Sequence, residues 1–191
     1  MATNFSTEDL TYEKLKGSHD LSAFKCEIND LNEFLEEKAL QQMVGKINVT
    51  YLTFLGSDLV AYFTLSTDAI KIVNILPEDK KLLESKGIPY SSLPALKLCR
   101  LAVDNRYKRM GIGTYLVEKV IKQALKLSED VGLRYITVDA YIKTHKFYIE
   151  NDNLDFTIWP GIAYKIRRWN ESENKDETAT VPVYMDIHDM R

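Results

Sequence analysis

The sequence predicts an α/β fold, with a mixed central sheet whose N-terminal half is antiparallel and with helices on both faces. Segments 47–55 and 59–72 are rich in Val, Thr, Tyr and Phe and flank the turn triplet Gly56-Ser57-Asp58, which indicates an antiparallel hairpin. In the second half, strand patterns at 96–103 and 135–140 enclose a long amphipathic helix. We therefore expect one layered domain, residues 1–191, with a core of about 12–187.

Two further elements are predicted in the N-terminal half, besides a plausible first strand at 12–15. A helix is expected over 30–43, with Asp30 as its cap and Glu33 completing a box-like pattern. Proline near the start and glycine at the end predict a short helix over 77–87.

The C-terminal elements are shorter. We expect a short helix at 144–148 and a strand at 156–159, followed by a charged and polar stretch over 167–177. A terminal strand is expected over 180–187, and Pro182 favours a place at a sheet edge or a strand start, because proline lacks the N–H that a central strand donates.

The sequence shows no pattern typical of a disulfide-bonded protein, a metal-binding protein or a membrane-spanning protein. Cys26 and Cys99 stand in no CxxC pattern and near no histidine cluster, which favours a reducing cytoplasmic compartment. The three histidines are far apart in sequence and show no metal-ligand spacing, so no metal site is expected. No apolar run approaches the length that spans a bilayer.

Charge is unevenly distributed along the chain. Residues 1–95 hold nine basic and fourteen acidic residues, a net charge of −5, whereas residues 96–191 hold sixteen and fourteen, a net charge of +2. Arg106, Lys108 and Arg109 can be assigned to ligand phosphates. Five other basic residues have no such role and either form a solvated basic face or contact a nucleic acid: Lys143, Lys146, Lys165, Arg167 and Arg168.

The turn Lys108-Arg109-Met110-Gly111-Ile112-Gly113 joins the strand at 96–103 to the amphipathic helix. The first N–H groups of a helix lack partners within it and the helix dipole makes that end partly positive, so a phosphate is a natural occupant. The alternative is an ordinary turn whose glycines only relieve steric crowding. The spacing fits neither a Walker loop nor the dinucleotide fingerprint.

This turn resembles the acetyl-CoA signature [Q/R]-x-x-G-x-[G/A] of the GNAT N-acetyltransferase superfamily, with Lys108 in the Gln/Arg position. The resemblance implies the GNAT fold and acetyl-CoA as cofactor, with its pyrophosphate on the amides of the turn. It also implies that the backbone of the preceding strand contacts pantetheine and the acetyl group. The cofactor-binding residues that it implies are Leu101, Ala102, Val103, Lys108, Arg109, Met110, Gly111, Ile112, Gly113 and Thr114.

The segment Thr144-His145-Lys146-Phe147-Tyr148 looks like the closing segment of that superfamily, although the Gly-Phe that usually follows is replaced by residues 150–156. The resemblance nominates Tyr148 as the catalytic acid that protonates the leaving thiolate. A phenol with a pKa of ~10 is protonated at neutral pH, so it can donate. The alternative is that Tyr148 only packs in the core. His145, Asp104 and Arg100 are weaker candidates for a proton relay or for holding the acceptor.

Arg100-Leu101-Ala102-Val103-Asp104 and the segment 24–35 are similar to the GNAT branch of aminoacyl-tRNA acetylating toxins from toxin-antitoxin pairs. That resemblance implies an N-acetyltransferase whose amine acceptor is aminoacyl-tRNA, with an antitoxin as partner; a homodimer is also expected. Two alternatives stay open. One is an enzyme for a small-molecule amine or a protein N-terminus, and the other is a CoA-binding regulator that does not catalyse.

Overall fold

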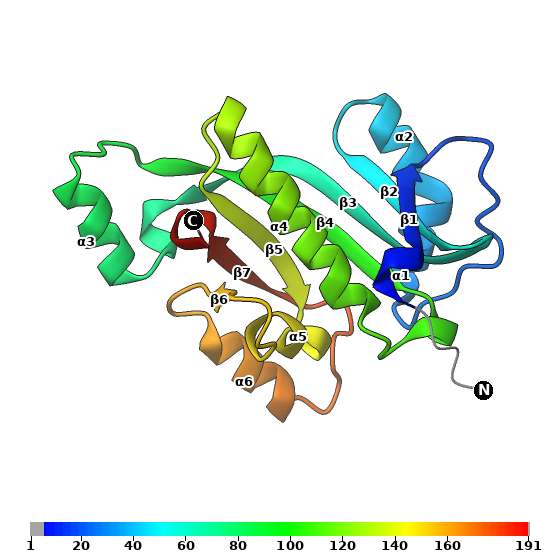
Figure 1. The fold of residues 1–191 in the computed structure, drawn as a ribbon. Helices are drawn as coiled ribbons and strands as arrows, with labels where there is room; N and C mark the ends of the chain where they lie inside the picture. The colour runs from blue at the N-terminus through cyan, green and yellow to red at the C-terminus, as the bar shows by residue number, and fades with distance from the viewer. Residues whose placement is uncertain (1–5, 191) are drawn as a thin grey trace. The chain divides into compact units, whose positions relative to one another are not determined.

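The computed structural model describes residues 6–190, which form an α/β fold around one seven-stranded sheet (Figure 1). The strand order in the sheet is β1-β2-β3-β4-β5-β7-β6. The strands are β1 Leu10–Lys14, β2 Val49–Leu55, β3 Asp58–Lys71, β4 Ser92–Val103, β5 Tyr135–Tyr141, β6 Thr157–Ile158 and β7 Thr180–Asp186. The α-helices are α1 Asn29–Glu33, α2 Ala39–Val44, α3 Pro77–Ser85, α4 Ile112–Asp130, α5 Lys146–Ile149 and α6 Ala163–Glu171.

The predicted fold class is confirmed. Within the chain, contacts gather in two compact units, one of residues 6–66 with 98–119 and one of residues 67–97 with 120–190. The predicted domain 1–191 also includes residues 1–5 and 191, which lie outside the described residues. No helix in the described part of the chain is long and apolar enough to cross a membrane.

In the first unit, β1, β2 and β3 form an antiparallel meander, as the hairpin pattern predicted. Leu55 pairs with Asp58 across a tight turn in which Gly56 has φ +59°, a left-handed value that glycine adopts without strain. Tyr62 of β3 donates a hydrogen bond to the carbonyl of Leu31 in α1 (2.6 Å) and packs edge-on against Phe24. These contacts fix the segment before α1 against β3.

In the second unit, β5, β7 and β6 form an antiparallel sheet. Tyr184 of β7 anchors α3 to it: the Tyr184 hydroxyl accepts from the N–H of Leu76 (2.9 Å) and donates to Asp79 (3.3 Å). Arg134 and Asp186 form an ion pair of 2.7 Å at the end of β5 and β7. The buried residues that join α3 to the strands are Ile70, Ile75, Leu83, Leu93, Ala95, Tyr135 and Tyr184.

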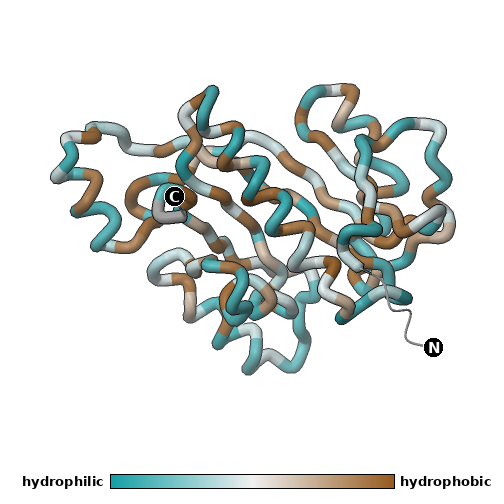
Figure 2. Tube along the Cα trace, in the orientation of Figure 1, coloured by the Kyte–Doolittle hydropathy of each residue, from teal (hydrophilic) through white to brown (hydrophobic). Residues whose placement is uncertain are grey.

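Helix α4 begins at the predicted glycine turn. Apolar and polar positions alternate along it with helical spacing, visible as brown and teal bands in Figure 2. The buried side chains on its apolar stripe are Ile112, Leu116, Val117, Val120, Ile121 and Ala124.

Three details of the predicted elements were wrong. The helix predicted over 30–43 consists of α1, a π-helical turn at Phe34–Lys38, and α2, and no side chain caps its start, because Ile28 occupies the cap position. The strand predicted over 96–103 begins four residues earlier, because β4 already starts at Ser92. Strand β7 lies between β5 and β6 and not at an edge.

Pro182 is tolerated inside the sheet because its neighbour β6 pairs with only two residues of β7, Val183 and Tyr184. The Pro182 carbonyl still accepts a hydrogen bond from the N–H of Trp159 (3.2 Å). The missing N–H therefore removes one donor without breaking the pairing with β5, where Pro182 faces Asp139.

Candidate active site

The glycine turn contains two residues with a left-handed backbone conformation just before α4. Arg109 has φ +58° and Gly111 has φ +80°, both in the left-handed region, and the first helical bond runs from the N–H of Tyr115 to the carbonyl of Gly111 (3.0 Å). Two left-handed residues within three positions fold the chain sharply back before α4 starts. The turn thus ends directly at the positive end of a 19-residue helix.

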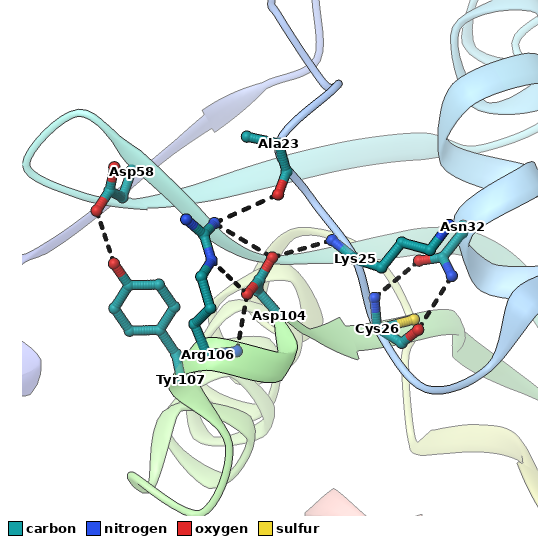
Figure 3. A network of polar contacts seen from close by, with 8 residues as sticks. All are labelled: Ala23, Lys25, Cys26, Asn32, Asp58, Asp104, Arg106 and Tyr107. Carbon is teal, nitrogen blue, oxygen red and sulfur yellow. Dashed lines mark hydrogen bonds and ion pairs between the residues drawn. The ribbon is translucent and has the colours of Figure 1, made fainter.

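Asp104, which follows β4, fixes the start of this turn (Figure 3). Its side chain is 1% exposed and accepts from the backbone N–H of Lys25 (2.9 Å), the backbone N–H of Arg106 (2.9 Å) and the Arg106 guanidinium (2.8 Å). Burial alone raises the pKa of this carboxyl, but the donors from Arg106 and Lys25 outweigh it and lower the pKa below its ordinary value. Asp104 is therefore ionised and holds Lys25 and Arg106 together; we call this arrangement the Asp104 clamp.

The clamp joins the turn to the segment before α1. The N–H of Asn105 donates to the carbonyl of Lys25 (2.8 Å), and the Arg106 guanidinium reaches the carbonyl of Ala23 (3.4 Å). Next to Lys25, Cys26 exchanges two hydrogen bonds with the buried Asn32 (2.9 and 3.0 Å). Figure 3 shows the bonds of Arg106 to Ala23 and of Cys26 to Asn32 beside the Asp104 side chain.

The cations of the turn differ in their partners. Arg106 is paired with Asp104, and Lys108 forms an ion pair with Glu27. Arg109 is exposed and has no ion-pair partner among the described residues. The prediction that Arg106 and Lys108 meet ligand phosphates stays a prediction; in the structure each has a carboxylate partner in its own unit, whereas Arg109 has none among the described residues.

The predicted backbone contacts at the end of β4 lie in the same unit as the turn. Ala102 is buried, and Leu101 and Val103 are partly buried. Immediately after them, the N–H of Asp104 donates to the carbonyl of Val60 in β3 (2.8 Å). The strand end is thereby held next to β3.

Tyr148 lies in the second unit, on α5. Its ring is 7% exposed and is packed edge-on between Phe147 (4.9 Å between centroids) and Phe156 (5.4 Å). Its hydroxyl has no hydrogen-bond partner among the described residues. Burial raises the pKa of Tyr148 above its ordinary value, so the phenol is protonated at neutral pH and has a proton to donate.

His145 and Arg100, the other candidates for a proton relay or for holding the acceptor, both interact with neighbouring residues of the protein. His145 is buried and its Nδ1 lies 2.6 Å from the carbonyl of Ile142, an arrangement in which the ring donates and fixes the start of α5. Arg100 lies over the ring of Phe34 (5.0 Å) and donates to the carbonyl of Cys99 (2.8 Å). Within the described residues, no group of three or more His, Cys, Asp or Glu side chains could hold a metal ion.

Two features of the site were missed in the sequence. Phe156 stands eight positions after Tyr148 and supplies the aromatic contact, although the expected Gly-Phe is absent. The Lys108–Glu27 pair joins residues far apart in the chain, and only the opposite charges could have hinted at it.

Known acetyltransferases are similar to this chain in sequence and in fold. Residues 72–150 match the model of the Acetyltransferase (GNAT) family. A tRNA-acetylating toxin of Mycobacterium tuberculosis is 24% identical over 148 residues, which is 77% of this chain and 84% of the relative. Two solved structures are similar along nearly the whole chain.

The structure of AtaT complexed with acetyl-methionyl-tRNAfMet is 26% identical, covers 95% of this chain and 97% of its own, and has a TM-score of 0.74. That of AtaTR bound with AcCoA is 27% identical, covers 96% of each chain, and has a TM-score of 0.70. Together with the glycine turn and the mixed sheet, these matches show an acetyltransferase that is similar in sequence and fold to the GNAT family, with tRNA-acetylating toxins among the similar proteins.

Proposed function

We propose that this enzyme transfers the acetyl group of acetyl-CoA to the amino group of aminoacyl-tRNA. The observation that carries the proposal is the clamped glycine turn at the start of α4, in a chain that matches AtaT in complex with acetyl-methionyl-tRNAfMet over 95% of its length. The transfer requires an anion site for CoA, a backbone that orients the thioester, and a proton for the leaving sulfur.

The turn fits the pyrophosphate of CoA. Its left-handed residues Arg109 and Gly111 expose backbone amides at a helix N-terminus, and Arg109 adds an unpaired guanidinium. In this proposal the binding residues are Lys108 through Thr114, and the main chain of Leu101, Ala102 and Val103 orients the pantetheine arm. Lys108 contributes by positioning, since Glu27 holds its ammonium group.

Acetyl-CoA supplies an activated acyl group, whose carbon forms a bond to the acceptor nitrogen while its bond to sulfur breaks. Tyr148, whose pKa is raised by burial so that the phenol is protonated before the transfer, donates its proton to the departing thiolate, and solvent then returns a proton to the phenolate. The α-amine of an aminoacyl ester has a lower pKa than a lysine side chain. It is substantially neutral near pH ~8, so water suffices to accept its proton.

The acceptor distinguishes this proposal from its alternatives. The wild-type enzyme is assayed with labelled acetyl-CoA against a charged tRNA pool, free amino acids, peptides and polyamines at two salt concentrations. We expect charged tRNA to be preferred and its acetylation to fall steeply with salt, because phosphate contacts release counterions. Transfer to a small amine without preference for charged tRNA would contradict the acceptor and leave the acetyltransferase intact.

Acetyl-CoA binding is tested by Gly111→Val. A millimolar concentration of acetyl-CoA, if ~100 times its Kd, should raise the melting temperature of the wild type by roughly 5–10 °C. Valine at φ +80° is strained by about 1–2 kcal/mol, and although an added Cβ meets no atom within 4 Å, it stands where the ligand approaches the amides. The variant should therefore show no rise.

Gly87→Val is the matched control. Gly87 also has a left-handed φ of +65° with nothing within 4 Å of an added Cβ, but it ends α3 and not the glycine turn. This variant should lose similar stability and keep the full response to acetyl-CoA. An unshifted melting temperature in the wild type would show that the assigned ligand is wrong.

The cellular setting belongs to the same proposal. We place the enzyme in the cytoplasm as a homodimer, with an antitoxin encoded beside it. The most direct observation is whether the adjacent reading frame encodes a small ribbon-helix-helix protein. A non-catalytic CoA-binding regulator is the second candidate; the Tyr148 hydroxyl, which makes no hydrogen bond to a described residue, favours the enzyme.

A further inference from the structure

We propose that the exposed face of α6 binds the single-stranded end of the RNA acceptor, with Tyr164 stacking on a base and three cations contacting phosphates. This inference rests on the proposed acceptor, aminoacyl-tRNA, and names the part of the protein that holds it. Helix α6, Ala163–Glu171 (Figure 1), was not predicted from the sequence. It lies in the same unit as Tyr148 of α5.

The structure divides the five basic residues that had no assigned role into two groups. Lys143 is paired with Glu177 (2.9 Å) and Lys146 with Glu150 (2.8 Å), so their charges are largely neutralised. The other three all lie on α6 and are exposed, and no carboxylate of the described residues pairs with them: Lys165, Arg167 and Arg168. Only this second group offers unbalanced positive charge to a polyanion.

Tyr164 adds an aromatic surface among these cations. Its side chain is 54% exposed, and positions 164, 167 and 168 share one helix face because they are three and four residues apart. The more buried positions, Ile166 and Trp169, hold the helix to its unit; Trp169 donates to the carbonyl of Asp176 (2.8 Å) and lies under Lys175. The Trp169 ring is thus held by contacts within the protein, whereas the Tyr164 ring is exposed to solvent and can stack on a base.

This combination favours single-stranded nucleic acid over other anionic partners. Base stacking on an exposed aromatic ring, with Arg and Lys beside it, is the usual way in which proteins hold unpaired nucleotides. A membrane surface would require several apolar side chains on the exposed face, and Tyr164 is the one large apolar residue of α6 that is exposed. The amino acid of a charged tRNA is attached to an unpaired 3′ end, which is the matching ligand.

The position of α6 along the chain fits that ligand. Phe156 packs against Tyr148. Helix α6 begins seven residues after Phe156, and the intervening strand β6 pairs with β7. Seven extended residues span at most about 25 Å, so α6 lies within a few nucleotides of the proposed catalytic phenol. An acceptor amine at Tyr148 would thus have its preceding nucleotides near α6.

The test compares two sets of charge variants in the full-length protein. Binding of fluorescent uncharged tRNA is measured at several salt concentrations for Lys165→Gln/Arg167→Gln/Arg168→Gln and for the control Lys143→Gln/Lys146→Gln. At about 0.7 per single-strand phosphate contact, the α6 variant should lower the slope of log K against log salt by about 2. The control should change it by less than half of that.

The stacking role of Tyr164 is tested with substitutions that change the aromatic ring and leave the charge of α6 unchanged. Tyr164→Leu should weaken binding of tRNA about 10-fold without changing the salt slope, and Tyr164→Phe should retain wild-type affinity, because the ring and not the hydroxyl stacks. A tRNA that lacks its unpaired 3′ nucleotides should bind the wild type and Tyr164→Leu equally.

Two results would contradict the proposal that the exposed face of α6 binds the single-stranded end of the RNA. One is an equal change of salt slope in the α6 variant and in the control, and the other is a loss of affinity for trimmed tRNA in Tyr164→Leu. Both are binding results and do not depend on catalysis. If the wild type acetylates only small amines, the proposed acceptor fails, and RNA binding still decides the role of α6.

Discussion

Tyr148→Phe is expected to lower kcat by about 10²-fold or more, with little change in the KM for acetyl-CoA. The reason is that the substitution removes only the proton donor. The hydroxyl makes no hydrogen bond to a described residue, so the phenyl ring should remain packed between Phe147 and Phe156 and the fold should be unchanged. Steady-state kinetics with saturating acceptor measure the effect.

Tyr135→Phe provides the control for this experiment. Tyr135 is fully buried in the second unit, and its hydroxyl has no hydrogen-bond partner among the described residues, yet nothing assigns it to the reaction. Its loss should leave kcat unchanged. An unchanged kcat in Tyr148→Phe would assign Tyr148 to the core and thiolate protonation to water.

Asp104→Ala should have the largest effect on acetyl-CoA binding and stability together. The substitution leaves the N–H of Lys25 and the Arg106 guanidinium without their acceptor, which lowers the free energy of unfolding by about 2–3 kcal/mol. Because the same carboxylate holds the first residues of the turn, the KM for acetyl-CoA should rise at least about 10-fold. Chemical denaturation and kinetics at saturating acceptor measure the two effects.

Asp104→Asn separates positioning from simple destabilisation. The amide keeps one oxygen, which can accept from Lys25 or Arg106 but not from both, so the KM should recover in part while kcat at saturation stays near that of the wild type. A variant that is destabilised but keeps the wild-type KM would show that the clamp has no role in ligand binding.

The Asp104 clamp also has a predicted pH dependence. Its pKa is lowered in the folded state, so it contributes stability at pH values above the unfolded pKa of about 4, and this contribution is lost as the pH falls through the folded pKa. The difference in stability between the wild type and Asp104→Asn should thus be constant near neutral pH and shrink below pH ~4.

The glycine turn, α4 and the hairpin were predictable because their signals are local. Gly111 and Gly56 mark left-handed positions, and α4 repeats its apolar residues over five turns. The Asp104 clamp was not predictable, since its partner Lys25 is 79 positions away and offers only a backbone N–H. No side-chain pattern reports a contact of that kind.

Helix α6 was missed for a different reason. Its nine residues are mostly polar, and its apolar positions begin before the helix, at Ile162, and recur at Ile166 and Trp169. That spacing of four and three residues is helical, but three residues are too few to outweigh the surrounding charge. The basic residues were noted in the sequence, whereas their division into paired and unpaired cations required the structure.

The most direct test of the proposed reaction locates the transferred acetyl group. Charged tRNA is incubated with the wild-type enzyme and labelled acetyl-CoA and is then digested with nuclease. The released aminoacyl-adenosine is analysed by mass spectrometry, and the free CoA thiol is measured in the same reaction. We expect one acetyl group on the α-amine of the amino acid for each thiol released, and almost none with Tyr148→Phe. Thiol release without an acetylated amino acid, or acetylation elsewhere on the RNA, would contradict aminoacyl-tRNA N-acetylation.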